Sequence, residues 1–435
     1  MQRVSCRTPL ASFGHPHRRT LISSYSNDML FRSRPSSILV RSLTLAGDRL
    51  RASRTRKHFT DASNIPQRVR TVAYFAGAPS DLYQLEQWIK PLEKLATDHG
   101  AAAFLIGNPR VAVAASKVTV LPVVFTPTSH SVESFVQGHR VEAVMYLNNN
   151  QANFTTLRIN GPTHIHLSHG ESEKSSMTSN QLKAYDYAFI AGQASQDRIL
   201  RHVRKFDAGH LIQIGRPQLD AVVPKDFPEA KGRIRVLYAP TWEGDGKDMA
   251  YGSLDSLGEG LVNALLTDSR IQLIFRPHPK SGTVARHYAR ALDRVKRNLL
   301  RTNSGGIPIH VIDTSRDGIS SIKGSDIVIS DISAMSMDAI GLDIPLVLTG
   351  RSALQDALAL SDDCAPPSLR EAVPNMGSVY GDDLPSWLLD LALKGPSQQQ
   401  RDFRQYVFGS GPLANSTDRF VQAVRDVSAE IPRRC

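Results

Sequence analysis

Cysteine is scarce in this sequence. Its 435 residues include only three cysteines, Cys6, Cys364 and Cys435, which lie far apart along the chain. An odd number at such spacing excludes a disulfide framework and a CxxC zinc or redox site. A chain of this length buries enough apolar surface to fold without such crosslinks, and we expect a reducing compartment.

Long apolar runs are also missing. No stretch approaches 18 consecutive apolar residues, so no transmembrane helix is predicted. The sequence also lacks the motifs GxGxxG, GxxxxGKS/T, GxSxG and HExxH. The sequence therefore gives no motif evidence for dinucleotide-binding, P-loop, hydrolase or zinc-protease function. We predict neither a cofactor nor a metal site.

Acidic residues are rare in the first 60 positions. This segment holds 12 arginines and lysines but only two acids, Asp28 and Asp48, so it carries ten of the net charge of +11. We predict a basic, disordered arm over residues 1–66, although its Arg- and Ser-rich composition is also that of a transit peptide. Two other interpretations stay open, namely a gene start placed too early, with Met29 as the true start, and an arm that binds an anionic membrane surface.

The rest of the chain is nearly neutral, with a net charge close to +1. Composition therefore supplies no basic face for nucleic acid, and no nucleic-acid partner is predicted.

Short apolar runs alternate with helical patterns from about residue 70 onward. Strands are predicted at 71–78, 101–107, 118–125, 141–147, 163–169, 187–192, 234–240, 271–277, 307–312, 325–330 and 344–349. Helices are predicted at 80–98, 255–267, 284–300, 333–342 and within 380–430. This alternation is typical of parallel sheets covered by helices. The polar, proline-containing stretch at 222–232 divides the pattern, so we predict two α/β domains at 67–222 and 233–435.

Ligands of open parallel sheets bind beyond the carboxyl ends of the strands, and polar clusters lie there. His169 ends one predicted strand and precedes Gly170, while Lys174 follows close enough to reach a phosphate. Imidazole suits proton abstraction near neutral pH, but packing of His169 in the sheet is an equal alternative, and both interpretations stay open. His164 and His166 are expected to have packing roles.

A second cluster surrounds His278, which stands between Pro277 and Pro279. The prolines stiffen the loop, and the cations Arg276 and Lys280 lie beside it. Such a loop suits diphosphate binding, which we favour over a rigid turn with a capping histidine.

Two weaker clusters complete the set. Asp331 and Ser333 follow a predicted strand and open a helix, so either residue can cap a helix N-terminus that attracts anions. A plain helix cap is the alternative. Thr241 and Trp242 follow another strand, where they can line a pocket.

Taken in order, these clusters resemble the CDP-glycerol glycerophosphotransferases of teichoic-acid synthesis. The matching residues are His169-Gly170 with Lys174, Gly215-Arg216-Pro217-Gln218-Leu219-Asp220, Tyr238-Ala239-Pro240-Thr241-Trp242, Arg276-Pro277-His278-Pro279, Ser325-Asp326, Ser330-Asp331-Ile332-Ser333-Ala334 and Asp338. Their order and spacing agree over about 163–350. The departures are Gln218 in place of arginine, Glu243 where a basic residue is common, and Ile332 and Ala334 in place of tyrosine and serine.

The resemblance implies a GT-B fold of two Rossmann-like domains that face each other across a cleft, an acceptor-side domain at 67–222 and a nucleotide-donor domain at 233–435. It also implies C-terminal helices, which often return to the first domain. It implies transfer of glycerol phosphate from a CDP-activated donor to a hydroxyl of a lipid-linked or cell-wall polymer acceptor, with release of CMP. The implied catalytic residues are His169 and His278. The implied phosphate-binding residues are Lys174, Thr241, Arg276, Asp331 and Ser333. The enzyme would act peripherally on the cytoplasmic face of the plasma membrane.

Three alternatives stay open. They are a GT-B glycosyltransferase that uses a nucleotide sugar, a nucleotide-sugar epimerase or hydrolase, and a binding protein without activity.

Overall fold

The computed structural model describes residues 65–172, 178–220, 222–244, 246, 250–304, 309–349, 367–376, 383–409 and 415–429. The predicted arm lies outside these ranges except for its last two residues, Ile65 and Pro66. Lys174 also lies outside the described residues.

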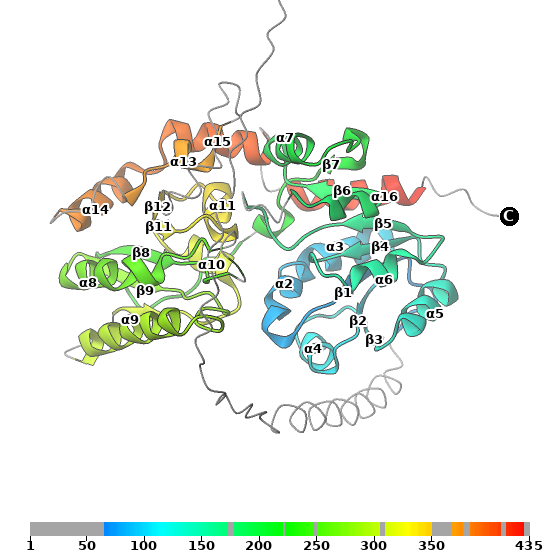
Figure 1. The fold of residues 1–435 in the computed structure, drawn as a ribbon, viewed down its shortest axis with the longest axis horizontal. Helices are drawn as coiled ribbons and strands as arrows, with labels where there is room; N and C mark the ends of the chain where they lie inside the picture. Colours follow the sequence, from blue (N-terminus) through cyan, green and yellow to red (C-terminus); the bar gives the residue numbers. More distant parts are fainter. Residues whose placement is uncertain are drawn as a thin grey trace, which may run out of the picture. The chain divides into compact units, whose positions relative to one another are not determined.

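Seven parallel strands form the first sheet, in the order β3-β2-β1-β4-β5-β6-β7 (Figure 1). The strands are β1 (Thr71–Phe75), β2 (Ala102–Ile106), β3 (Val123–Phe125), β4 (Ala143–Tyr146), β5 (Thr163–His166), β6 (Tyr187–Ile190) and β7 (Leu211–Gln213). Their helices are η1 (Pro79–Asp81), α2 (Leu82–Glu86), α3 (Ile89–His99), α4 (Pro109–Ala115), α5 (Ser129–His139), α6 (Asn153–Leu157), η3 (Asn180–Ala184), α7 (Gln193–His202), η4 (Ala208–His210) and η5 (Pro217–Leu219). We call this sheet with its helices the first lobe.

Five parallel strands form the second sheet, in the order β10-β9-β8-β11-β12. They are β8 (Ile234–Ala239), β9 (Ile271–Phe275), β10 (Val311–Ile312), β11 (Ile327–Ser330) and β12 (Leu346–Leu348). Their helices are η7 (Leu254–Gly258), α8 (Glu259–Thr267), α9 (Arg286–Ser304), α10 (Gly318–Lys323), α11 (Ala334–Gly341), α13 (Leu369–Ala372) and α14 (Leu384–Lys394). We call this part the second lobe.

Each sheet has one point where the strand order reverses. The chain builds outward from β1 to β3 and then returns to β4, and it repeats this path from β8 to β10 and back to β11. Diverging connections leave a crevice at the carboxyl ends of such central strands. The topology thus places one candidate crevice in each lobe, after β1 and β4 in the first and after β8 and β11 in the second.

The central strands are apolar because both faces of each sheet are covered. Every residue of β2, β4, β9 and β11 is buried. Fully buried parallel strands read as continuous apolar runs, which is why they were detectable in the sequence. The segment 222–233 contains neither helix nor strand and joins the lobes, as its prolines predict.

The last helix corrects the predicted domain boundary. Helix α16 (Ser416–Ala429) lies with the strands of the first sheet rather than with the second lobe (Figure 1). Its Phe420 and Val424 are buried in the same apolar cluster as Trp88 and Phe189. Residues 233–435 are therefore not one domain, because the chain returns to the first lobe after completing the second.

Helix α15 (Gln398–Phe408) links the two lobes. Its Phe403 and Val407 share a buried cluster with Ala194 of the first lobe and Met337 of the second. The Tyr406 hydroxyl also donates a 2.7 Å hydrogen bond to the Asp197 carboxylate on α7.

Two local differences from the sequence prediction have simple causes. The helix predicted at 80–98 is interrupted between α2 and α3, because Pro91 has no N–H for the carbonyl of Gln87 and its ring crowds that carbonyl. Strand β7 was not predicted, because its three residues are too few to show a periodic pattern.

None of the described helices is long and apolar enough to cross a membrane.

Candidate active site

A cavity of about 410 Å³ is lined by residues that follow the central strands of both lobes. Five of the predicted site residues line it: His169, Thr241, Arg276, His278 and Ser333. His169 and His278 thus lie in one cavity although 108 residues separate them in the sequence.

The backbone after β5 turns sharply to present His169. Ser168 adopts a left-handed conformation with φ 60°, and its carbonyl accepts a 2.6 Å hydrogen bond from the buried Trp88 indole. A side chain at Gly170 would bring Cβ to 3.0 Å from the Cβ of Ala334, the first residue of α11. The glycine of this motif therefore lets the second lobe approach closely beside the histidine.

His164 and His166, by contrast, are buried in the sheet. The ring nitrogens of His164 contact the Tyr146 hydroxyl at 2.8 Å and the Ile159 carbonyl at 2.9 Å. Burial lowers the pKa of His166 to about 4, so this imidazole is neutral near pH 7. Both histidines pack as expected.

His278 is held by its own loop and by an aromatic neighbour. Its Nδ1 accepts a 3.1 Å hydrogen bond from the Lys280 backbone amide, which places the proton of a neutral ring on Nε2. Trp242 stacks on the imidazole, with the ring centroids 6.1 Å apart. Lys280 lies over the same indole at 5.5 Å. The two motifs that contain these residues therefore form one surface.

Tyr83 connects the two histidines and was missed by the sequence analysis. Its ring lies edge-on to His169 at 6.3 Å and to His278 at 6.1 Å. The phenol oxygen accepts a 3.2 Å hydrogen bond from Gln84, which in turn accepts one from Asn148 at 3.1 Å. Burial is the main cause that raises the pKa of Tyr83. The available signal was its place in the first turn of α2, the helix that follows the central strand β1.

Arg276 lines the cavity, but its charge is balanced within the second lobe. Its guanidinium donates to the Asp313 carboxylate at 2.6 Å and to the Ser315 carbonyl at 2.6 Å. Burial raises the pKa of Asp313, but Arg276, the Lys225 ammonium and hydroxyl donors outweigh this effect and hold the pKa well below its usual value. Arg276 therefore lines the cavity and also holds Asp313 and the Ser315 backbone in place.

Ser333 and Asp331, the two predicted helix-cap and phosphate-binding residues, have different roles in the structure. Ser333 is the N-cap of α11, and its hydroxyl accepts a 3.4 Å hydrogen bond from the Ser336 amide. Asp331 is not the cap, which corrects one of the two predicted alternatives. It is buried outside the cavity lining and accepts hydrogen bonds from the amides of Thr241 at 2.8 Å and Ser253 at 3.2 Å.

Asp331 therefore fixes the Thr241 loop rather than facing the cavity. Glu243 has a similar role, because its carboxylate accepts hydrogen bonds from the amides of Gly282, Val284 and Ala285. Burial raises the pKa of Glu243, but these amides lower it further, so that the net shift is downward. The acid at this position thus positions the loop that follows His278.

In the described part of the chain, three ion pairs connect the lobes around the cavity. Lys280 pairs with Asp81 at 2.8 Å, and Arg316 pairs with Glu86 at 2.7 Å. The third pair joins Arg216 to Asp338 and is almost fully buried. Among the described residues, no group of three or more His, Cys, Asp or Glu side chains is arranged to hold a metal ion.

Solved structures define the class of fold. The chain is similar to a variant of the wall teichoic acid polymerase TagF soaked with CDPG, with 16% identity and a TM-score of 0.55 over 93% of this chain and 100% of that chain. A putative UDP-N-acetylglucosamine 2-epimerase from Listeria monocytogenes matches with 13% identity and a TM-score of 0.55 over 84% and 98%. MnaA from S. aureus with UDP matches with 11% identity and a TM-score of 0.52 over 84% and 99%. The predicted GT-B fold is confirmed.

A family comparison narrows the assignment. Residues 139–349 match the model of the CDP-Glycerol:Poly(glycerophosphate) glycerophosphotransferase family. This match confirms the resemblance that the motifs carry. No protein with a curated description matches the sequence significantly.

Proposed function

We propose that the protein transfers glycerol phosphate from CDP-glycerol to a hydroxyl of a lipid-linked or cell-wall polymer acceptor and releases CMP. The observation that carries this proposal is the pair His169 and His278, one from each lobe, on the edge of the same Tyr83 ring. The N-terminus of α11 lies at the same cavity, through Ser333 and Ala334.

In-line phosphoryl transfer requires mainly positioning and neutralisation of charge. We assign His169 as the base that takes the proton of the acceptor hydroxyl, because it comes from the acceptor-side lobe. His278 and the first amides of α11 would hold the diphosphate, since helix N-termini and imidazole N–H groups bind anions. CMP then leaves from the second lobe with the proton balance completed by solvent.

The first test is substrate choice. The full chain is incubated with CDP-glycerol, CDP-ribitol or UDP-sugars, with and without a glycerol phosphate oligomer as acceptor, and release of CMP or UDP is measured. We expect acceptor-dependent CMP release from CDP-glycerol. UDP release that exceeds CMP release would indicate a glycosyltransferase, and release without an acceptor would indicate an epimerase or hydrolase.

The second test separates the two histidines. His169→Ala should lower the transfer rate by about 10²–10⁴-fold while calorimetry shows unchanged donor affinity, as expected for the loss of a general base. His278→Ala should weaken donor binding or slow donor cleavage. Near wild-type turnover of His169→Ala would show that His169 is not the catalytic base. Unchanged donor affinity and rate for His278→Ala would show that the donor binds outside this cavity.

We further propose that the enzyme works as a peripheral protein on an anionic membrane surface. Besides the basic arm, helix α9 supports this proposal. One face of α9 packs in the second lobe through Tyr288, Ala291, Val295 and Leu299. Its exposed residues include four arginines: Arg286, Arg290, Arg297 and Arg301. Leu300 on the same helix is 55% exposed, and basic charge beside exposed apolar groups suits a bilayer surface.

Vesicle co-sedimentation tests this contact. We expect the doubly substituted Arg290→Glu/Arg297→Glu protein and the chain without residues 1–60 each to bind phosphatidylglycerol vesicles less well than the wild type. Binding should weaken with salt, and transfer to a soluble acceptor should be unchanged. Arg204→Glu, an exposed arginine of the first lobe, is the matched control. Equal binding by all variants, or binding insensitive to salt, would contradict this contact.

A further inference from the structure

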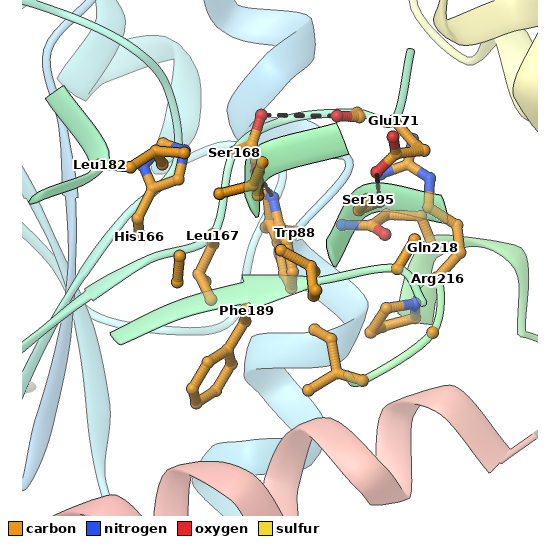
Figure 2. Close-up of a pocket in the computed structure, with 18 of the residues that line it drawn as sticks. Trp88, His166, Leu167, Ser168, Glu171, Leu182, Phe189, Ser195, Arg216 and Gln218 are labelled. Atoms are coloured by element: carbon orange, nitrogen blue, oxygen red, sulfur yellow. Dashed lines mark hydrogen bonds between the residues drawn. The ribbon is translucent and has the colours of Figure 1, made fainter. Parts of the chain in front are cut away.

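A second, smaller cavity of about 50 Å³ lies within the first lobe (Figure 2). Its wall is formed by the end of β5, the start of α7 and the turn at η5. Gly170 lines both this cavity and the larger one that contains His169. The small cavity is therefore a neighbour of the candidate active site, and neither catalytic histidine lines it.

Four buried polar atoms in the wall of this cavity have no hydrogen-bond partner. Both amide atoms of Gln218 are unpaired, and so are Nδ1 of His166 and Nε of Arg198. Gln218 is 8% exposed and His166 is 5% exposed. Buried polar groups are nearly always satisfied in folded proteins, so such a concentration points to a ligand.

The remaining polar groups of the wall are already used to build it. The Glu171 carboxylate accepts a 2.8 Å hydrogen bond from the Ser195 hydroxyl and pairs with the Arg198 guanidinium (Figure 2). This pairing holds Arg198 in place and balances its charge. The Arg198 Nε–H and the Gln218 amide are then the groups that face a ligand.

The unpaired atoms select the chemistry of that ligand. Gln218 offers one acceptor and one donor group, and Arg198 Nε adds a donor. A phosphate or carboxylate only accepts and would leave the Gln218 oxygen unmatched, whereas an ammonium only donates and would leave the donors unmatched. A hydroxyl both donates and accepts, so neutral hydroxyl groups satisfy this mixed set.

The size of the cavity limits the ligand further. The small cavity offers about 50 Å³, against about 410 Å³ for the larger one, so it suits a group of a few heavy atoms. A terminal HO–CH₂–CHOH unit, with two carbons and two oxygens, is a group of this size.

We propose that the small cavity binds the terminal vicinal diol of a glyceryl group, through Gln218, Arg198 and His166. This inference rests on the proposed function and names what the site recognises. The diol is that of the glyceryl group of the CDP-linked donor, because the terminal hydroxyl of a polymer acceptor must lie beside His169 to react, and His169 does not line this cavity. No bond is made or broken in the cavity, since its role is selection and positioning beside Gly170.

The first experiment measures binding without catalysis. Glycerol 3-phosphate and 3-hydroxypropyl phosphate, which lacks the second hydroxyl, are titrated into the wild-type chain by calorimetry. We expect glycerol 3-phosphate to bind at least about tenfold more tightly, because only its diol matches both the donors and the acceptor. Equal affinities would overturn the proposal, and because no turnover is needed, this result is independent of whether the proposed transfer occurs.

The second experiment uses a matched pair of buried glutamines. Gln218→Leu removes the unpaired amide, whereas Gln400→Leu removes an amide that is hydrogen-bonded to the backbone of Ile344 and Leu346. We expect Gln218→Leu to abolish the preference for glycerol 3-phosphate without lowering the melting temperature. We expect Gln400→Leu to lower the melting temperature and keep the preference.

Kinetics then test whether the cavity serves the donor. We expect Gln218→Leu to raise KM for CDP-glycerol by at least about tenfold while KM for a glycerol phosphate oligomer stays at the wild-type value. If both KM values and the preference for glycerol 3-phosphate stay at wild-type values in a folded Gln218→Leu protein, the cavity holds water only and the proposal is wrong.

Discussion

The guanidinium of Arg216 and the carboxylate of Asp338 form a two-pronged ion pair between the lobes, with Nε and Nη2 donating over 2.9 and 3.3 Å. Arg216 is 4% exposed and Asp338 is 1% exposed. Arg216 also donates a 3.5 Å hydrogen bond to the His169 carbonyl. Arg216, in the segment Gly215-Arg216-Pro217 of the first lobe, therefore contacts both α11 of the second lobe and the backbone of the candidate base His169.

Breaking this pair should be costly. Asp338→Asn leaves a buried guanidinium without its counter-charge, and we expect a loss of about 3–5 kcal/mol of stability. The double substitution Arg216→Met/Asp338→Leu should recover most of that loss, because an apolar pair of similar volume leaves no charge buried. Thermal unfolding measures both. A double variant that is no more stable than Asp338→Asn would contradict a direct pair.

Tyr83 should act through its ring rather than its hydroxyl. Tyr83→Phe keeps both edge-on contacts with the histidines, so we expect kcat within about threefold of wild type. Tyr83→Ala removes two aromatic contacts, each worth about 0.5–1.5 kcal/mol, and should lower kcat by about ten- to hundredfold. Affinity for CMP serves as the check that the donor lobe is intact. Tyr74→Ala, whose ring packs on Tyr146, is the control for general loss of packing.

His166 should make the fold sensitive to acid. Its pKa falls from 6.5 in the unfolded chain to about 4 in the folded protein, mainly through burial and also through repulsion by His169. Between these values the unfolded chain binds more protons, so stability is complete above pH 6.5 and declines as the pH falls toward 4. The loss should reach about 3 kcal/mol.

Unfolding curves measured from pH 7 to pH 4 check this prediction. His166→Asn should flatten the pH dependence by that amount. Burial also lowers the pKa of His164 and His310, so a residual slope is expected in the variant. Identical slopes in the two proteins would mean that His166 titrates normally in the fold.

Asp331 and Ser333 should differ in their effect on stability. Ser333→Ala removes an N-cap and should cost about 1 kcal/mol. Asp331→Ala leaves the buried amides of Thr241 and Ser253 without an acceptor, and each such orphan costs about 1–3 kcal/mol. We therefore expect Asp331→Ala to have the lower melting temperature. The reverse order would show that the Thr241 loop does not depend on this carboxylate.

The fold could be predicted from the sequence because buried parallel strands are continuous apolar runs. The carboxyl ends of these strands must lie at one edge of each sheet. This rule alone placed His169 and His278 near ligand-binding edges, and the structure brings them into one cavity. The contacts of Tyr83, Asp81 and Glu86 could not be predicted in the same way, because each depends on a partner from the other lobe.

The roles of some motif residues depend on their buried partners, which the sequence does not show. Arg276 and Asp331 stand in suggestive motifs, but the partners that fix them, Asp313 and the Thr241 amide, become visible only in three dimensions. The pattern of α16 did not show its return to the first lobe, because an amphipathic helix does not encode which core it covers; only the resemblance to the GT-B fold implied it.

The position of α16 also constrains how the chain is made. Phe420 and Val424 complete the core around Trp88, yet they are synthesised after the whole second lobe. A ribosome that adds about 5–20 residues per second finishes the first lobe's other elements many seconds before this helix exists. During that interval the first lobe carries an open apolar groove, so the two lobes cannot mature strictly in the order of their synthesis. The first lobe can complete its core only after the second lobe has been synthesised.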